Sequence, residues 1–209
     1  MKTKEYYELL GRINDLESSF NKLKLKLKSE NEFNDEKDMQ NVKDTKISKN
    51  KMIADIRKIL ALDLEEKGFF IRKAIPKNGE GSGIIIEDED KSIKKKIMVK
   101  KSKDYSEQYN LHNEYNFSGW FTLNGSEIGE YDGYVFTVYK DALPTYFVFD
   151  KDDMELILSQ KTFDSKSNYH FYLAEDKNSQ YLDHRDGGIL LSENVNAWEK
   201  IEEIVMNTI

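Results

Sequence analysis

The chain of 209 residues contains no cysteine and only two prolines. Without cysteine it has no disulfide framework, no thiolate zinc site and no thiol nucleophile. Its longest apolar runs are four or five residues, so no segment is predicted to span a membrane. Met1 is followed by Lys-Thr-Lys-Glu and by no apolar stretch, so we expect no secretory signal. We expect a soluble cytoplasmic protein.

The composition is polar but typical of a folded chain. Charged residues make up 34% of the sequence and hydrophobic residues 38%, while the aromatic share of 12% is too high for a disordered protein. The length fits one domain with a small additional element.

Charge is distributed unevenly along the chain. Residues 1–103 hold 25 Lys and Arg against 19 Asp and Glu, whereas residues 104–209 hold 7 against 20. Residues 91–103 contain seven lysines and no acid. Such a segment indicates a nucleic-acid-binding face or, equally, solvated lysines that block aggregation at a strand edge. The candidate nucleic-acid-binding residues are Lys94, Lys95, Lys96, Lys101 and Lys103.

Residues 1–30 carry a heptad pattern that predicts a coiled-coil-like helix. The apolar positions of this seam are Tyr6, Leu9, Ile13, Leu16, Phe20, Leu23 and Leu27. A lone helix would expose this stripe, so we expect a homodimer through Leu9 to Leu27, the alternative being a helix that docks on the chain's own domain. A polar linker is predicted over residues 31–48.

Residues 49–209 predict an α+β domain with a central mixed β-sheet flanked by helices. A helix capped by Ser48 or Asn50 ends near Gly68, and several strands follow it. Pro144 is expected in a turn, residues 159–188 are expected to be irregular, and a last helix is expected over residues 192–206.

Several segments, in this order, resemble the PD-(D/E)xK nuclease superfamily, which has the restriction-endonuclease-like fold. The similarity covers about residues 50–205. Its segments are Leu-Glu-Glu-Lys-Gly-Phe-Phe-Ile (64–71), the hairpin of residues 83–103 with Ile-Met-Val-Lys-Lys-Ser-Lys (97–103), Gly-Trp-Phe (119–121), Asp-Gly-Tyr-Val-Phe (132–136), Pro-Thr-Tyr-Phe-Val-Phe (144–149) and Asn-Ala-Trp-Glu-Lys-Ile (196–201).

The resemblance implies a phosphodiesterase centre on the hairpin. In that family an Asp begins the second strand, and an acid lies two residues before a Lys on the third strand, so that both third-strand side chains share one face. The carboxylates hold Mg²⁺, which activates water and polarises the phosphate. In this chain Gly83 and Met98 occupy the acidic positions and only Lys100 is retained. We therefore expect Gly83 and Met98 to be neighbours on adjoining strands.

Three interpretations stay open. The site has lost its metal and the protein acts by binding nucleic acid or protein in bacterial DNA restriction, defence or counter-defence; no cofactor is then expected. Alternatively the acids have moved, and Glu87 and Asp55 join Lys100 in an active Mg²⁺-dependent deoxyribonuclease. In the third interpretation only the fold is shared, and the role is unrelated, such as an adaptor or inhibitor whose acidic second half binds a basic partner protein.

Aromatic residues follow the lysine-rich strand. They are Tyr105, Tyr109, Tyr115, Phe117 and Trp120. Side chains of this type stack on unpaired bases or, more often in a protein with β-sheets, pack in the core and in loops.

Overall fold

A computed structural model describes residues 47–207 of the chain. The predicted dimer seam from Leu9 to Leu27 and the linker up to residue 46 lie outside the described residues, so both remain predictions.

The described part of the chain is α+β. Its helices, strands and 3-10 turns follow one another as α2 (Lys49–Leu64), β1 (Phe69–Lys73), η1 (Pro76–Asn78), β2 (Gly83–Asp88), β3 (Lys94–Lys103), β4 (Tyr115–Asn124), β5 (Gly133–Lys140), β6 (Leu143–Phe149), α3 (Lys151–Ser159), β7 (Asn168–Asp176), β8 (Tyr181–Asp183), β9 (Ile189–Leu190), η2 (Ser192–Asn194) and α4 (Glu199–Met206).

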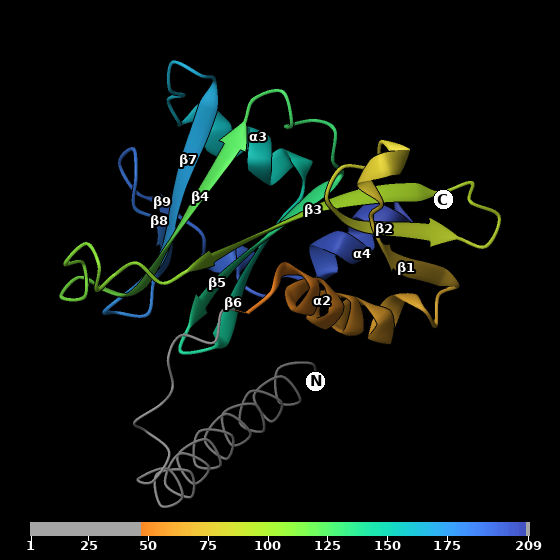
Figure 1. The fold of residues 1–209 in the computed structure, drawn as a ribbon, viewed down its shortest axis with the longest axis horizontal. Helices are drawn as coiled ribbons and strands as arrows, with labels where there is room; N and C mark the ends of the chain where they lie inside the picture. The colour runs from red at the N-terminus through yellow and green to blue at the C-terminus, as the bar shows by residue number, and fades with distance from the viewer. Residues whose placement is uncertain (1–46, 208–209) are drawn as a thin grey trace, which may run out of the picture. The chain divides into compact units, whose positions relative to one another are not determined.

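Two sheets organise the described part (Figure 1). The central sheet has five strands in the order β1-β2-β3-β5-β6, and it is mixed because β3 and β5 are parallel while its other neighbours are antiparallel. The second sheet has four antiparallel strands in the order β4-β7-β8-β9. The predicted mixed central sheet is confirmed.

The two faces of the central sheet are covered differently. Helices α2 and α4 pack on one face, where their apolar side chains meet those of β1, β2, β3, β5 and β6. The opposite face packs against the second sheet and α3. The predicted flanking helices are present, with α2 and α4 on one face and α3 on the other, but strands β4 and β7 supply most of the second layer.

Helix α2 forms as its sequence predicts. The Ser48 hydroxyl accepts a hydrogen bond from the Lys51 amide at 3.1 Å and caps the helix. Five side chains at helical spacing are buried, and burying each one stabilises the fold by about 1.5–3 kcal/mol. Gly68, with φ of +84°, turns the chain into β1.

Three sequence expectations about the second half were wrong. The last helix, expected over residues 192–206, is only α4 (Glu199–Met206), and residues 192–194 form the 3-10 turn η2. Pro144 lies within β6 and not in a turn; β6 is an edge strand, where a residue without an amide hydrogen is tolerated. The turn is made instead by Asp141 and Ala142, both with positive φ. Residues 159–188, which were expected to be irregular, contain β7. Its alternating side chains Phe171 and Leu173 pack in the core between the two sheets.

Within residues 47–207, no helix has the length and apolar character needed to cross a membrane.

Candidate functional site: a lysine-lined pocket

The hairpin of β2 and β3 places Gly83 directly opposite Met98 in the antiparallel register. This is the neighbourhood that the sequence predicts. Lys100 lies two residues beyond Met98, on the same face of β3. Both residues line a pocket, whereas Ile97 and Val99 point into the core beneath α2 and α4.

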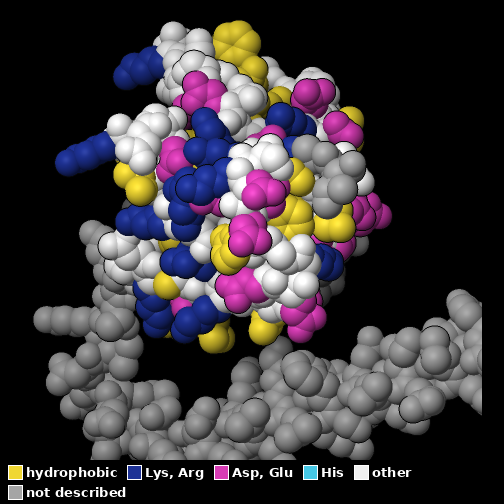
Figure 2. Space-filling model, turned by 90° about the vertical axis from the view of Figure 1, so that its right-hand side faces the viewer, with side chains coloured by type: hydrophobic (Ala, Val, Ile, Leu, Met, Phe, Trp, Pro, Cys, Tyr) yellow, Lys and Arg dark blue, Asp and Glu magenta, His cyan; other side chains and the backbone are white. Residues whose placement is uncertain are grey.

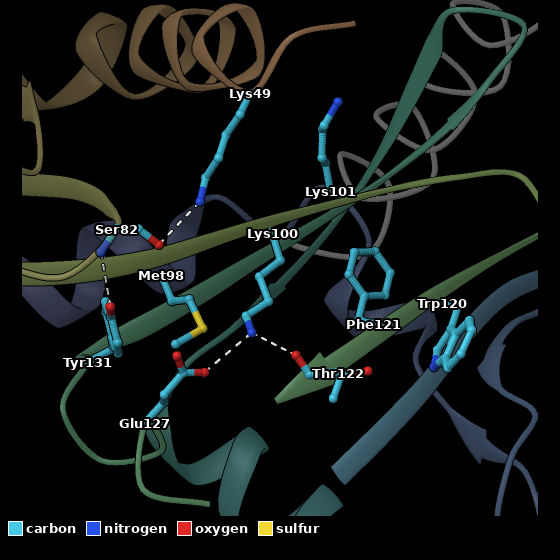
Figure 3. Close-up of a pocket in the computed structure, with 10 residues that line it drawn as sticks. All are labelled: Lys49, Ser82, Met98, Lys100, Lys101, Trp120, Phe121, Thr122, Glu127 and Tyr131. Carbon is cyan, nitrogen blue, oxygen red and sulfur yellow. Dashed lines mark hydrogen bonds and ion pairs between the residues drawn. The ribbon is translucent and has the colours of Figure 1, made fainter. Parts of the chain in front are cut away.

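The pocket has a volume of about 330 Å³ and lies between β3 and β4 (Figure 3). Lysines predominate among its charged side chains, and the single acid among them is Glu127. The lining residues are Lys49, Ser82, Met98, Lys100, Lys101, Trp120, Phe121, Thr122, Glu127 and Tyr131.

Lys100 extends across the pocket from β3. Its Nζ donates a hydrogen bond to the carbonyl oxygen of Thr122 at 2.6 Å and lies 3.4 Å from Oε2 of Glu127 (Figure 3). Glu127 is about half exposed, so water screens this ion pair and its net contribution to stability is under about 1 kcal/mol. An anion that enters the pocket can therefore displace Glu127 at low cost.

Lys49 reaches the same pocket from the first turn of α2. Its Nζ donates to the hydroxyl of Ser82 at 3.2 Å. Desolvation, followed by the nearby charges of Lys100 and Lys73, lowers the pKa of Lys49 below its ordinary value. Glu127 acts in the opposite direction but does not outweigh burial and the two lysines.

The residues present do not fit a magnesium ion. Gly83 has no side-chain donor, and the thioether of Met98 is a poor ligand for a hard cation. Met98 is also only 2% exposed, and it packs in the core between the two sheets. In the described part of the chain, no three His, Asp or Glu side chains come together as a group that could hold a metal.

Glu87 lies away from Lys100. It is opposite Lys94 in the register, six positions along β3 from Lys100, a separation of about 20 Å at the rise of a strand. Its Oε1 accepts a hydrogen bond from Arg72 at 3.0 Å. Arg72 also donates two hydrogen bonds to the buried carboxylate of Glu80. Nζ of Lys94 donates to the same carboxylate at 2.8 Å. Glu87 thus belongs to an ion-pair network that fastens the loop before β2.

Asp55 lies on α2 near the aromatic side chains of the core beneath that helix. Burial, and then the proximity of Tyr146 and of Asp55, raises the pKa of Tyr139 to about 12. The structure therefore brings neither Asp55 nor Glu87 to Lys100, and the three residues proposed for a rearranged nuclease are not gathered in one site.

The other lysines of β3 point to both faces of the strand, and several have partners. Lys94 pairs with Glu80, and Lys95 lies 3.8 Å from Asp132. Lys101 donates to the Ile47 carbonyl and lines the pocket, while Lys103 lies 5.0 Å from the ring centre of Tyr105. Lys96 is half-buried.

The surface therefore carries mixed charge. Figure 2 shows Lys and Arg side chains gathered in a band with Asp and Glu side chains among them. The lysine-rich segment does not form one uniform basic stripe, because several of its lysines lie beside acids.

No protein-family model, curated protein or solved structure matches this chain.

Sequence reasoning missed most of the pocket around Lys100. Lys49 directly follows the helix cap Ser48. This position at the start of the domain was the one sequence feature that could have indicated Lys49 as a pocket residue. Thr122 and Glu127 come from β4 and from the loop after it, so only the packing of the two sheets brings them to β3.

Proposed function

We propose that this domain binds nucleic acid through backbone phosphates held by Lys100 and Lys49, and that it does so without a metal. The observation that carries the proposal is the convergence of these two ammonium groups in a pocket beside Gly83 and Met98. By its resemblance to the PD-(D/E)xK superfamily, the domain would serve bacterial DNA restriction, defence or counter-defence by binding rather than cutting.

Electrostatics support a phosphate as the group bound in the pocket. Desolvation, and then the charge of Lys100, disfavours the protonated form of Lys49, and an anion beside both lysines would offset these effects. The hydroxyl of Ser82 is already within hydrogen-bond distance of Lys49 and adds a donor for a phosphate oxygen. Each phosphate neutralised by a lysine releases condensed counterions, so binding is expected to weaken as salt rises.

Replacing Lys100 by Gln is expected to weaken binding of labelled DNA about tenfold at low salt. The slope of the logarithm of the binding constant against the logarithm of the salt concentration is expected to become shallower by about one. Fluorescence anisotropy over a range of salt concentrations measures both quantities. Lys58→Gln is the matched control, because Lys58 is an exposed lysine about 13 Å further along α2 from Lys49. Equal effects of the two substitutions would refute the phosphate pocket.

DNA affinity is expected to decline as the pH rises. The decline is expected at a lower pH than if the binding lysine had its ordinary pKa. Lys49 binds phosphate only when protonated, and its lowered pKa means that it loses its proton at a lower pH than a free lysine. Lys49→Arg keeps the charge at all accessible pH values, so this variant is expected to flatten the alkaline decline. Anisotropy titrations at a series of pH values test it, and an unchanged profile in the variant would exclude Lys49 as the titrating group.

A further inference from the structure

The outer face of the second sheet carries a set of aromatic side chains that the core does not use. Strand alternation turns Phe121 of β4 and Phe171 of β7 inward, and so turns the intervening positions outward. We call these outward rings the aromatic surface: Tyr105, Tyr109, Trp120, His170 and Tyr172.

Trp120 is the centre of the aromatic surface. Its ring centre lies 6.0 Å from that of Tyr172, 6.1 Å from His170 and 6.5 Å from Tyr105. Tyr109 continues the row at 5.9 Å from Tyr105. Trp120 is 40% exposed and Tyr109 is 54% exposed, so parts of both side chains are open to solvent.

Cationic groups border these rings. The Lys103 ammonium lies 5.0 Å from the ring centre of Tyr105, and the Arg185 guanidinium lies 5.3 Å from that of Tyr172. Rings with cations beside them attract a ligand that combines flat, polarisable groups with negative charge. Arg185 also lies 3.7 Å from Oδ2 of Asp186 and donates to the Tyr172 hydroxyl at 3.2 Å, so its charge is partly balanced. An apolar peptide would use neither cation.

The aromatic surface is continuous with the lysine pocket, because Trp120 and its neighbour Thr122 line that pocket together with Lys100 (Figure 3). A ligand that places a phosphate on Lys100 therefore extends its neighbouring groups toward the indole of Trp120. Among nucleic acids, only a strand with unpaired bases can lay those bases on an open ring, since a duplex keeps them stacked and paired inside the helix.

We propose that this protein prefers single-stranded nucleic acid, with unpaired bases stacked on Trp120 and its neighbours while the adjoining phosphate occupies the lysine pocket. This inference rests on the proposed function for the phosphate contact and adds the class of nucleic acid. Stacking on aromatic side chains tolerates any base, so the preference concerns strandedness and not sequence.

Tryptophan fluorescence gives a direct test, because the chain has two tryptophans. Trp198 packs on Tyr146 in the core beneath α2, so Trp198→Phe leaves Trp120 as the single emitter. Titration of this variant with oligothymidylate is expected to quench the Trp120 emission, and a duplex of equal length is expected to quench it much less. Absence of quenching at saturating oligothymidylate, with binding confirmed by anisotropy, would overturn the inference.

Affinity measurements separate this inference from the proposed function. Trp120→Ala is expected to weaken oligothymidylate binding about tenfold and to leave duplex binding within twofold. Phe70→Ala is the matched control, because Phe70 is an aromatic on β1 that is 56% exposed and lies outside the aromatic surface. Circular dichroism and thermal unfolding establish that each variant is folded.

Each outcome has a defined meaning. If Lys100→Gln weakens binding of both nucleic acids while Trp120→Ala affects both equally or neither, the phosphate pocket stands and the single-strand inference is wrong. If Lys100→Gln has no effect while Trp120→Ala weakens oligothymidylate selectively, the aromatic surface binds bases and the proposed phosphate site is wrong. If Lys100→Gln weakens binding of both nucleic acids and Trp120→Ala weakens binding of oligothymidylate alone, both the phosphate pocket and the single-strand inference are supported.

Discussion

Gly83→Ala is expected to destabilise the domain by about 3 kcal/mol, because a methyl group at this position has no room. An added Cβ would overlap the carbonyl oxygen of Ile97, and it would lie 3.1 Å from the carbonyl carbon of Ile97 and 3.3 Å from Cα of Met98. All three are backbone atoms of β3, so no side-chain rotation relieves the overlap. Strands β2 and β3 would have to separate locally.

Urea unfolding measures this effect, and Gly68→Ala is its control. Both glycines have a positive φ, +155° at Gly83 and +84° at Gly68, but a Cβ at Gly68 meets no atom within 4 Å. Its substitution carries only the conformational cost of a left-handed residue, about 1–2 kcal/mol. Equal losses for the two variants would show that β2 and β3 are not closely packed at Gly83.

The same geometry predicts that two substitutions will not restore a nuclease metal site. In the double variant Gly83→Asp with Met98→Glu, the first side chain meets the backbone of β3, and the second places a carboxylate in a core position that is 2% exposed. We expect lower stability than for Gly83→Ala and no increase of the melting temperature with added Mg²⁺. A magnesium-dependent rise would mean that the backbone can reopen into a metal site.

Local sequence signals predicted helix α2 and the hairpin of β2 and β3. The cap at Ser48 and the apolar spacing of α2 fix that helix, since both signals lie within a few turns of chain. The alternation of β3 likewise separated Ile97 and Val99 from Met98 and Lys100. Each of these features depends on neighbours in sequence.

The second sheet could not be predicted in the same way. Its longest pairing joins β4 to β7, with Trp120 opposite Tyr172, and residues 125–167 separate the two strands in the sequence. The lysine pocket depends on this sheet, because Thr122 and Trp120 come from β4. The sequence therefore indicated Lys100 as a candidate residue without indicating its surroundings.

A buried lysine is the feature least expected from the sequence. Lysines are almost always exposed, yet the side chain of Lys161 has no exposed surface, and neither has that of Asp183. Lys161 Nζ lies 2.7 Å from Oδ2 of Asp183 and donates to the carbonyl oxygen of His170 at 2.9 Å. Asp183 in turn accepts hydrogen bonds from the backbone amides of Tyr172 and Arg185. The pair thus connects β7 and β8 beneath the aromatic surface.

Lys161→Met is expected to destabilise the domain by about 3–5 kcal/mol, because it leaves the Asp183 carboxylate buried without a counter-charge. Asp183→Asn is expected to cost less, because Lys161 Nζ still lies 3.5 Å from Oδ2 of Asp186 and Asn keeps an oxygen for the two backbone amides. The double variant removes both charges and is expected to lose clearly less than the sum of the single losses. Urea unfolding of the four proteins gives the coupling between the two residues.

Lys67→Met is the matched control for burial. Lys67 Nζ lies 2.6 Å from Oε2 of Glu202, nearly the same distance as in the buried pair, but the Lys67 side chain is 40% exposed. Water screens this pair, so its loss is expected to cost much less than the loss of the buried pair. Similar losses for Lys67→Met and Lys161→Met would show that water reaches Asp183. A large difference would establish that the second sheet is held by an ion pair whose strength comes from its burial.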